Sequence, residues 1–102
     1  MGVKLRTNGD QVTLVVNGRF EFASHSEFRA CTEEGLAMPG IKSVAVDLSQ
    51  VNYLDSAALG MLLVLLEKSQ AAGTGRVTLT GVGGMVLQVL DVAQFGRMFD
   101  IK

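Results

Sequence analysis

Asp55-Ser56-Ala57-Ala58-Leu59-Gly60 is followed by an unbroken run of apolar residues up to Leu66. This stretch predicts a helix that begins at the Asp-Ser pair and ends near Ala72, where Gly73-Thr74-Gly75 follows. We expect Ser56 to be the N-cap, because a serine oxygen accepts well from a backbone N–H of the first turn. A phosphate on Ser56 would also face the positive end of the helix dipole. The position can therefore be modified without unfolding of the chain.

The predicted helix is more apolar than one buried face requires. At about 100° per residue, one stripe of this helix is expected to face the core. The stripe consists of Leu59, Leu62, Leu63 and Leu66, and Leu65 lies at its margin. The stripe on the opposite side of the helix contains small and apolar residues and lies beside Lys68. It consists of Ala57, Gly60, Met61 and Val64. Two interpretations stay open, namely packing against a neighbouring helix and a protein-docking face beside Ser56. Gly60 favours docking slightly, because glycine inside a helix costs about 1 kcal/mol relative to alanine.

Strand and helix patterns alternate along the rest of the chain. An antiparallel hairpin is predicted around Asn8-Gly9, and further strands follow it; the strands cover residues 3–7, 12–16, 41–48, 76–80 and part of 95–101. Two more helices are predicted over residues 24–36, with Gly35 as a stop, and over residues 85–92. We expect one α/β domain over residues 1–102, with a mixed sheet of four to five strands and three or more helices. Right-handed crossovers would place the first two long helices on the same face.

Composition argues against several functional classes. The net charge of −1 provides no basic field for nucleic acid. The apolar run over residues 57–66 is far shorter than the ~20 residues of a membrane span, and the N-terminus does not resemble a signal peptide. We therefore expect a cytoplasmic protein without direct membrane insertion. The single cysteine, Cys31, cannot form a disulfide within the chain and is expected to be a small core residue.

Catalytic and metal chemistry find little support in the residues. His25 is the only histidine, and with the single cysteine it provides too few ligands for a metal site. A triad of Ser56, His25 and either Asp47 or Asp55 is disfavoured, because nothing in the sequence brings His25 to Ser56. The glycines of residues 81–84 lack the lysine and hydroxyl of a P-loop and predict a tight turn. We expect a binding protein without enzyme activity, cofactor or metal.

The segment Asp47-Leu48-Ser49-Gln50-Val51-Asn52-Tyr53-Leu54-Asp55-Ser56-Ala57-Ala58-Leu59-Gly60 resembles the signature of STAS domains, in particular bacterial anti-sigma factor antagonists. The resemblance covers nearly the whole chain. Gly18-Arg19-Phe20-Glu21-Phe22-Ala23 is similar to the family's turn from second strand to first helix. In that family the serine directly after the aspartate is phosphorylated by a partner kinase, which is also the anti-sigma factor. A PP2C-type phosphatase removes the phosphate, and the matching residue here is Ser56.

Two departures from the family pattern bear on the site. Family members commonly have a second serine and a glycine where this chain has Ala57 and Ala58, so Ser56 is the only hydroxyl at the junction. Glu21 stands where the family often has an aspartate near the partner-binding surface. The resemblance implies a surface of small, apolar and acidic residues that contacts the partner; it consists of Glu21, Asp55, Ser56, Ala57, Gly60, Met61 and Val64.

The resemblance implies a switch. The unphosphorylated chain would bind a serine kinase/anti-sigma factor and release its sigma factor, and phosphorylation of Ser56 would end that binding. Nothing in the sequence demands more than a monomer. The family also includes domains attached to anion transporters and small subunits of membrane lipid-transport complexes. The alternative function is therefore that of a STAS accessory subunit of a membrane lipid/ABC transport complex.

Overall fold

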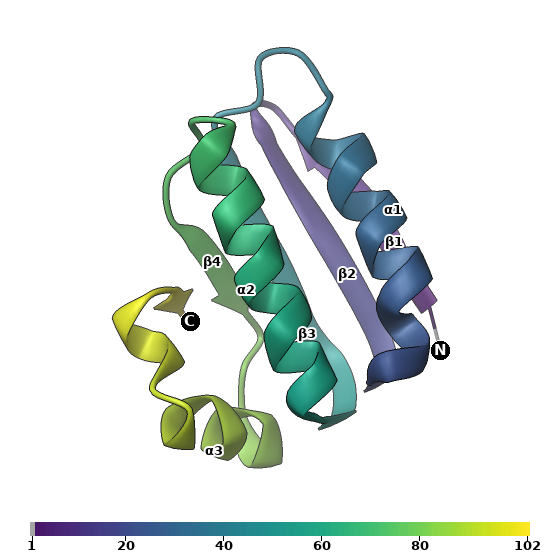
Figure 1. Cartoon of the computed structure of the whole chain (residues 1–102), viewed down its shortest axis with the longest axis vertical. Coiled ribbons are helices and arrows are strands. Elements are labelled where there is room, and N and C mark those ends of the chain that lie inside the picture. Colours follow the sequence, from purple (N-terminus) through teal and green to yellow (C-terminus); the bar gives the residue numbers. More distant parts are fainter. Residues whose placement is uncertain (1) are drawn as a thin grey trace.

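The computed structural model describes residues 2–102 and shows a five-stranded sheet in the order β1-β2-β3-β4-β5. β1 and β2 are antiparallel, whereas the other neighbours are parallel. Helices α1 and α2 lie side by side on one face (Figure 1). The α/β class, the mixed sheet and the shared face of the two long helices are thereby confirmed. The elements are β1 (Gly2–Asn8), β2 (Gln11–Phe20), η1 (Phe22–Ser24), α1 (His25–Leu36), β3 (Ser43–Leu54), α2 (Ser56–Ala71), β4 (Val77–Thr80), α3 (Gly84–Val92), η2 (Phe95–Arg97) and β5 (Asp100–Ile101).

The hydrophobic core lies between the sheet and its helices. Alternate residues of a strand point to the same face, and in the central strands one such set is almost inaccessible to solvent; it comprises Val12, Leu14, Val16, Val44, Val46 and Leu48. The residues between them form a more polar face, where Arg6 and Asp47 are paired at 3.8 Å. Within residues 2–102, no helix combines the length and apolar character needed to cross a bilayer.

The two central strands extend further than the sequence pattern predicts. The third strand was expected to end at Leu48, but β3 continues to Leu54, directly before α2. Pairing with β2 supports this extension, because Phe20 is the register partner of Leu54. Residues 49–53 are all exposed or half-buried, so the apolar pattern that marks a buried strand stops before them.

The expected stop of the first helix at Gly35 is wrong for a reason of packing. Gly35 does not end the first helix but lies inside α1, where a Cβ atom would meet Leu5 Cδ1 at 3.1 Å. Its missing side chain thus lets α1 approach β1. The last strand expected within residues 95–101 is confirmed as β5, which has only 2 residues and follows η2. Phe95 and Phe99 anchor this tail, because both rings are buried and stack with centroids 5.1 Å apart.

Candidate functional site

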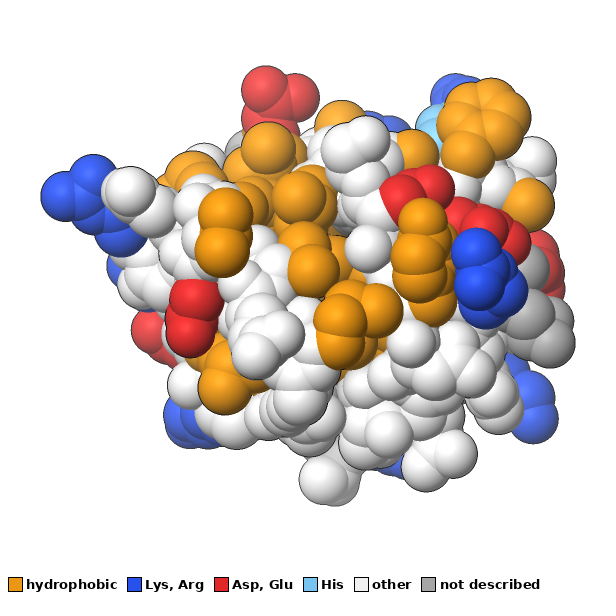
Figure 2. Space-filling model, turned by 90° about the horizontal axis from the view of Figure 1, so that it is seen from below, with side chains coloured by type: hydrophobic (Ala, Val, Ile, Leu, Met, Phe, Trp, Pro, Cys, Tyr) orange, Lys and Arg blue, Asp and Glu red, His pale blue; other side chains and the backbone are white. Residues whose placement is uncertain are grey.

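Two of the predicted site residues lie at one edge of the sheet. β2 and β3 end as neighbours at Phe20 and Leu54, so Glu21 and Asp55 follow at the same edge. The backbone N–H of Asp55 donates to the Phe20 carbonyl at 3.4 Å. Figure 2 looks onto this end of the molecule, where hydrophobic side chains gather beside a group of acidic and basic ones. Carboxyl ends of parallel strands are a frequent place for binding sites in α/β proteins.

Asp55, rather than Ser56, caps the helix at this edge. Its backbone is extended (φ −113°, ψ −178°), and its carboxylate accepts from the Ala58 N–H at 3.0 Å. Aspartate and serine are equally good caps, and the end of β3 decides which of the two neighbours occupies the position. The expectation that Ser56 is the N-cap is therefore wrong.

Ser56 is the first residue of α2 and is exposed. Its hydroxyl makes no hydrogen bond to another residue that the structure describes. Because Asp55 already fills the cap position, a chemical group added to the Ser56 oxygen would displace no contact that holds the fold. The oxygen is also open to another protein.

Glu21 is held in an ionic and aromatic cluster next to this junction. Arg19 Nε lies 3.2 Å from Glu21 Oε1, and the Arg19 guanidinium lies 3.9 Å from the centre of the Tyr53 ring. The Ser24 hydroxyl accepts from the Glu21 N–H at 3.2 Å and donates to the Arg19 carbonyl at 3.1 Å. The turn from β2 into η1 is thus fixed by side-chain hydrogen bonds, and the Glu21 side chain is 29% exposed.

The buried side of α2 differs from the predicted stripe. Leu63 was expected in the core but is 40% exposed, whereas Met61 was expected outside and is buried. Leu65 is fully buried rather than marginal. The reason is that α1 packs along α2, so the buried arc extends from the sheet toward α1. The buried residues of the helix are Ala58, Met61, Leu62, Leu65, Leu66 and Ser69.

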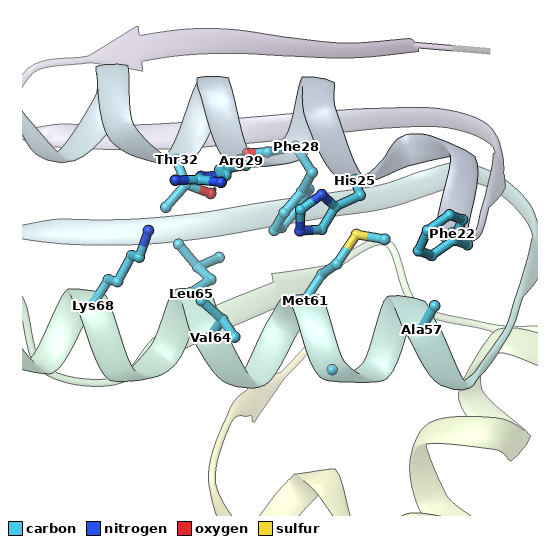
Figure 3. A pocket seen from close by; sticks show the side chains of 11 residues that line it. Phe22, His25, Phe28, Arg29, Thr32, Ala57, Met61, Val64, Leu65 and Lys68 are labelled. Carbon is cyan, nitrogen blue, oxygen red and sulfur yellow. Dashed lines mark hydrogen bonds between the residues drawn. The ribbon is translucent and has the colours of Figure 1, made fainter.

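A groove of about 500 Å³ lies between α1 and α2 (Figure 3). All four residues of the predicted small apolar stripe line it, namely Ala57, Gly60, Met61 and Val64. Met61 points toward α1 in the close view, whereas Val64 stays 50% exposed. The stripe is therefore divided between helix packing, at Met61, and the exposed surface, at Val64.

Phe22 borders the same groove and was not singled out from the sequence. It belongs to η1 and is 75% exposed, which is unusual for so large an apolar side chain. A phenylalanine in a turn that otherwise consists of small and charged residues was the available signal.

The histidine and the cysteine considered as metal ligands make separate contacts along α1. His25 lines the α1–α2 groove. No group of three or more His, Cys, Asp or Glu side chains within residues 2–102 could hold a metal ion. Cys31 is half-buried, and its Sγ lies 3.6 Å from the Val3 carbonyl oxygen. Burial, followed by the negative charges of Glu34 and Glu27, raises the pKa of Cys31 above its ordinary value and disfavours the reactive thiolate.

Comparisons with known proteins agree with this geometry. A family model described as "Mlab, STAS domain" matches residues 3–100. A STAS-domain containing protein of Pseudomonas aeruginosa (strain UCBPP-PA14) is 35% identical over 96 residues, which cover 93% of this chain and 91% of that protein. The crystal structure of a putative anti-sigma factor antagonist from Thermotoga maritima is 22% identical, with a TM-score of 0.83 over 97% of this chain and 84% of that one.

SpoIIAA has also been solved in two forms that share this fold. The unphosphorylated anti-sigma factor antagonist is 17% identical, with a TM-score of 0.75 over 99% of this chain and 87% of that one. The phosphorylated form, from Bacillus, is 15% identical, with a TM-score of 0.73 over 99% and 91%. From its matched family model and its relative in Pseudomonas, the chain belongs to the STAS-domain family.

Proposed function

We propose that this chain is an anti-sigma factor antagonist whose binding to a serine kinase/anti-sigma factor is switched off by phosphorylation of Ser56. The observation that carries the proposal is the position of Ser56: exposed, first in α2, not needed as the cap and next to an apolar groove. In this function the chain is a cytoplasmic monomer that acts by binding and is not an enzyme. The unphosphorylated form binds the kinase, which then releases its sigma factor.

The partner surface combines an acidic edge with a small apolar arc; it consists of Glu21, Asp55, Ser56, Ala57, Gly60, Met61 and Val64. Gly60 is exposed, and a Cβ atom built on it would meet nothing within 4 Å. A partner backbone can therefore approach α2 closely at this point. Met61 is only 7% exposed and contributes through the floor of the groove rather than by projecting from the surface.

A phosphate would act differently on the fold and on the interface. Phosphorylation adds about −1.5 to −2 charges, which the N-terminal end of α2 tolerates through its dipole. The similarity of this chain to both forms of SpoIIAA supports a fold compatible with the modification. At an interface, by contrast, the charge must lose its water beside the Asp55 carboxylate. A change from 99% bound to 1% bound requires the binding free energy to weaken by about 5.5 kcal/mol. An unpaired buried phosphate can supply this difference. A PP2C-type phosphatase would reverse the step, because the Ser56 oxygen is accessible.

Intact-mass and peptide mass spectrometry of the chain purified from its native cells tests the proposal. We expect one phosphoryl group on Ser56, and none on the Ser56→Ala variant. Ser26→Ala is the matched control, since Ser26 is an exposed serine in the first turn of α1, and it should keep the modification. A phosphoryl group that persists in Ser56→Ala, or an unmodified wild-type chain in every growth phase, would contradict the proposal.

A second candidate function rests on the description of the matched family model, which names Mlab. As a STAS accessory subunit of a membrane lipid/ABC transport complex, the chain would use the same outward side of α2 without a reversible phosphate. The same purification separates the two functions. A membrane ATPase that copurifies with an unphosphorylated chain would favour the transport subunit.

A further inference from the structure

The groove between α1 and α2 has an apolar floor and one cationic end. Its floor consists of Phe28, Met61 and Leu65, none of them more than 7% exposed. Arg29 and Lys68 lie together at one end of the groove in Figure 3. Both pair with the same oxygen of Glu33, Arg29 Nε at 3.3 Å and Lys68 Nζ at 3.7 Å. Two positive charges thus share one negative charge, and this end keeps a net charge of +1.

The two ends of the groove differ in the residues that border them. The Glu33–Lys68 ion pair connects α1 to α2 at the cationic end, with Lys68 Nζ 3.7 Å from Glu33 Oε2. Ala57 and Phe22 border the other end, where Phe22 is largely exposed (Figure 3). From Ala57 to Lys68 the groove follows α2 for about 16 Å, at 1.5 Å per residue. A ligand with an anionic head group and an apolar chain would match both the cationic end and the apolar floor.

We propose that this groove binds a single-chain amphiphile with a carboxylate head, that is, a long-chain fatty acid. The head group would lie between Arg29 and Lys68, and the alkyl chain would extend over Met61 toward Phe22. A volume of about 500 Å³ lies within the range of about 300–1,000 Å³ that is typical of small-molecule sites. The Arg29 and Lys68 side chains are 63% and 38% exposed, so the head group can reach them beside Glu33. This site does not depend on phosphorylation of Ser56, and either proposal can fail without the other.

NMR titration of the ¹⁵N-labelled chain with dodecanoate, below its micellar concentration, tests the inference. We expect saturable binding of one ligand, with the largest shifts at Ala57, Gly60 and Val64. Dodecanol, which lacks the charge, should bind at least about tenfold more weakly, equivalent to about 1.4 kcal/mol. Dodecyltrimethylammonium, which reverses the charge, should bind more weakly still. Ser56→Asp should leave dodecanoate binding unchanged, even where it abolishes binding of the kinase.

Two variants test the two ends of the groove. Lys68→Glu should weaken dodecanoate at least about tenfold, whereas Lys4→Glu, the same charge change at an exposed residue of β1, should not. Gly60→Leu should block the groove and weaken dodecanoate and dodecanol alike, because the added side chain enters open space. The proposal is overturned by non-saturable binding, by equal affinity for dodecanol, by equal losses in Lys68→Glu and Lys4→Glu, or by shifts centred on Val89 and Val92 of α3.

Discussion

The two sides of helix α2 are similar in composition but opposite in environment. Leu62 is completely inaccessible, whereas the next residue, Leu63, is 40% exposed. The side toward the sheet completes the core. The outer side has Ser56 at its start and then Gly60 and Val64 along the wall of a groove. Apolar side chains on the outer side bury little surface on folding, so binding is the better reason for their presence.

The largest expected effect contrasts Leu62 with Leu63. Leu62→Ala should lower the free energy of unfolding by about 2–5 kcal/mol, because it leaves a cavity in a packed core. Leu63→Ala should lower it by less than about 1 kcal/mol. Urea denaturation followed by circular dichroism measures both values. Equal losses would mean that the outer side is part of the core.

The next effect separates the cap, Asp55, from the proposed modification site, Ser56. Asp55→Ala should lower the free energy of unfolding by about 0.5–2 kcal/mol, because the Ala58 N–H loses its acceptor. Ser56→Ala should change it by less than about 0.5 kcal/mol. Thermal denaturation of the two variants at one pH gives the comparison. A larger loss of stability in Ser56→Ala than in Asp55→Ala would indicate that Ser56 is the cap.

A smaller effect of opposite sign is expected at Gly60. Gly60→Ala should raise the free energy of unfolding by about 0.5–1 kcal/mol, because the helix gains propensity and the new Cβ meets no neighbour. Denaturant titration measures the gain. If the residue marks a close approach of the partner, the same variant should bind the kinase more weakly, and unchanged binding would remove Gly60 from the interface.

The smallest effect is expected far from α2, on the polar face of the sheet. Partial burial of Asp47 tends to raise its pKa, but hydrogen bonds from Ser49 and the charge of Arg6 outweigh burial and leave the pKa below its ordinary value of 3.8. A lowered pKa in the folded state contributes stability that is present above pH 3.8 and is lost as the pH falls through the folded-state value.

Asp47→Asn should therefore be less stable than the wild type near neutral pH by a few tenths of a kcal/mol, up to about 1 kcal/mol. The difference should shrink as the pH falls below 3.8. Urea denaturation at a series of pH values measures it. A difference in stability between Asp47→Asn and the wild type that stays constant with pH would show that the Asp47 charge does not contribute to stability.

Much of the fold can be predicted from the sequence because its signals are local. The Asn8-Gly9 turn, the buried residues around Val44 and Val46 and the apolar run after Ser56 each identify one element. The orientation of α2 is different, because it depends on where α1 packs. For this reason Leu63 is exposed and Met61 is buried, the reverse of the prediction, although each residue fits a stripe of helical spacing.

The site shows the same division between local and tertiary information. The Asp55-Ser56 junction can be predicted, and the structure places it at the start of a helix. The assignment of the cap to Asp55 depends on how far β3 pairs with β2, which no local pattern specifies. Phe22 and the Arg19–Tyr53 contact depend on the path of the turn between β2 and α1. The groove exists only once both helices are in place.

The affinity of the chain for the proposed serine kinase/anti-sigma factor, measured with variants of Ser56, tests the central proposal most directly. Isothermal titration calorimetry should show tight binding for the wild type and for Ser56→Ala, and binding weakened at least about 100-fold, or about 2.7 kcal/mol, for Ser56→Asp. Ser26→Asp, which adds the same charge at the start of α1, should bind like the wild type. Equal affinity of Ser56→Ala and Ser56→Asp would contradict the switch.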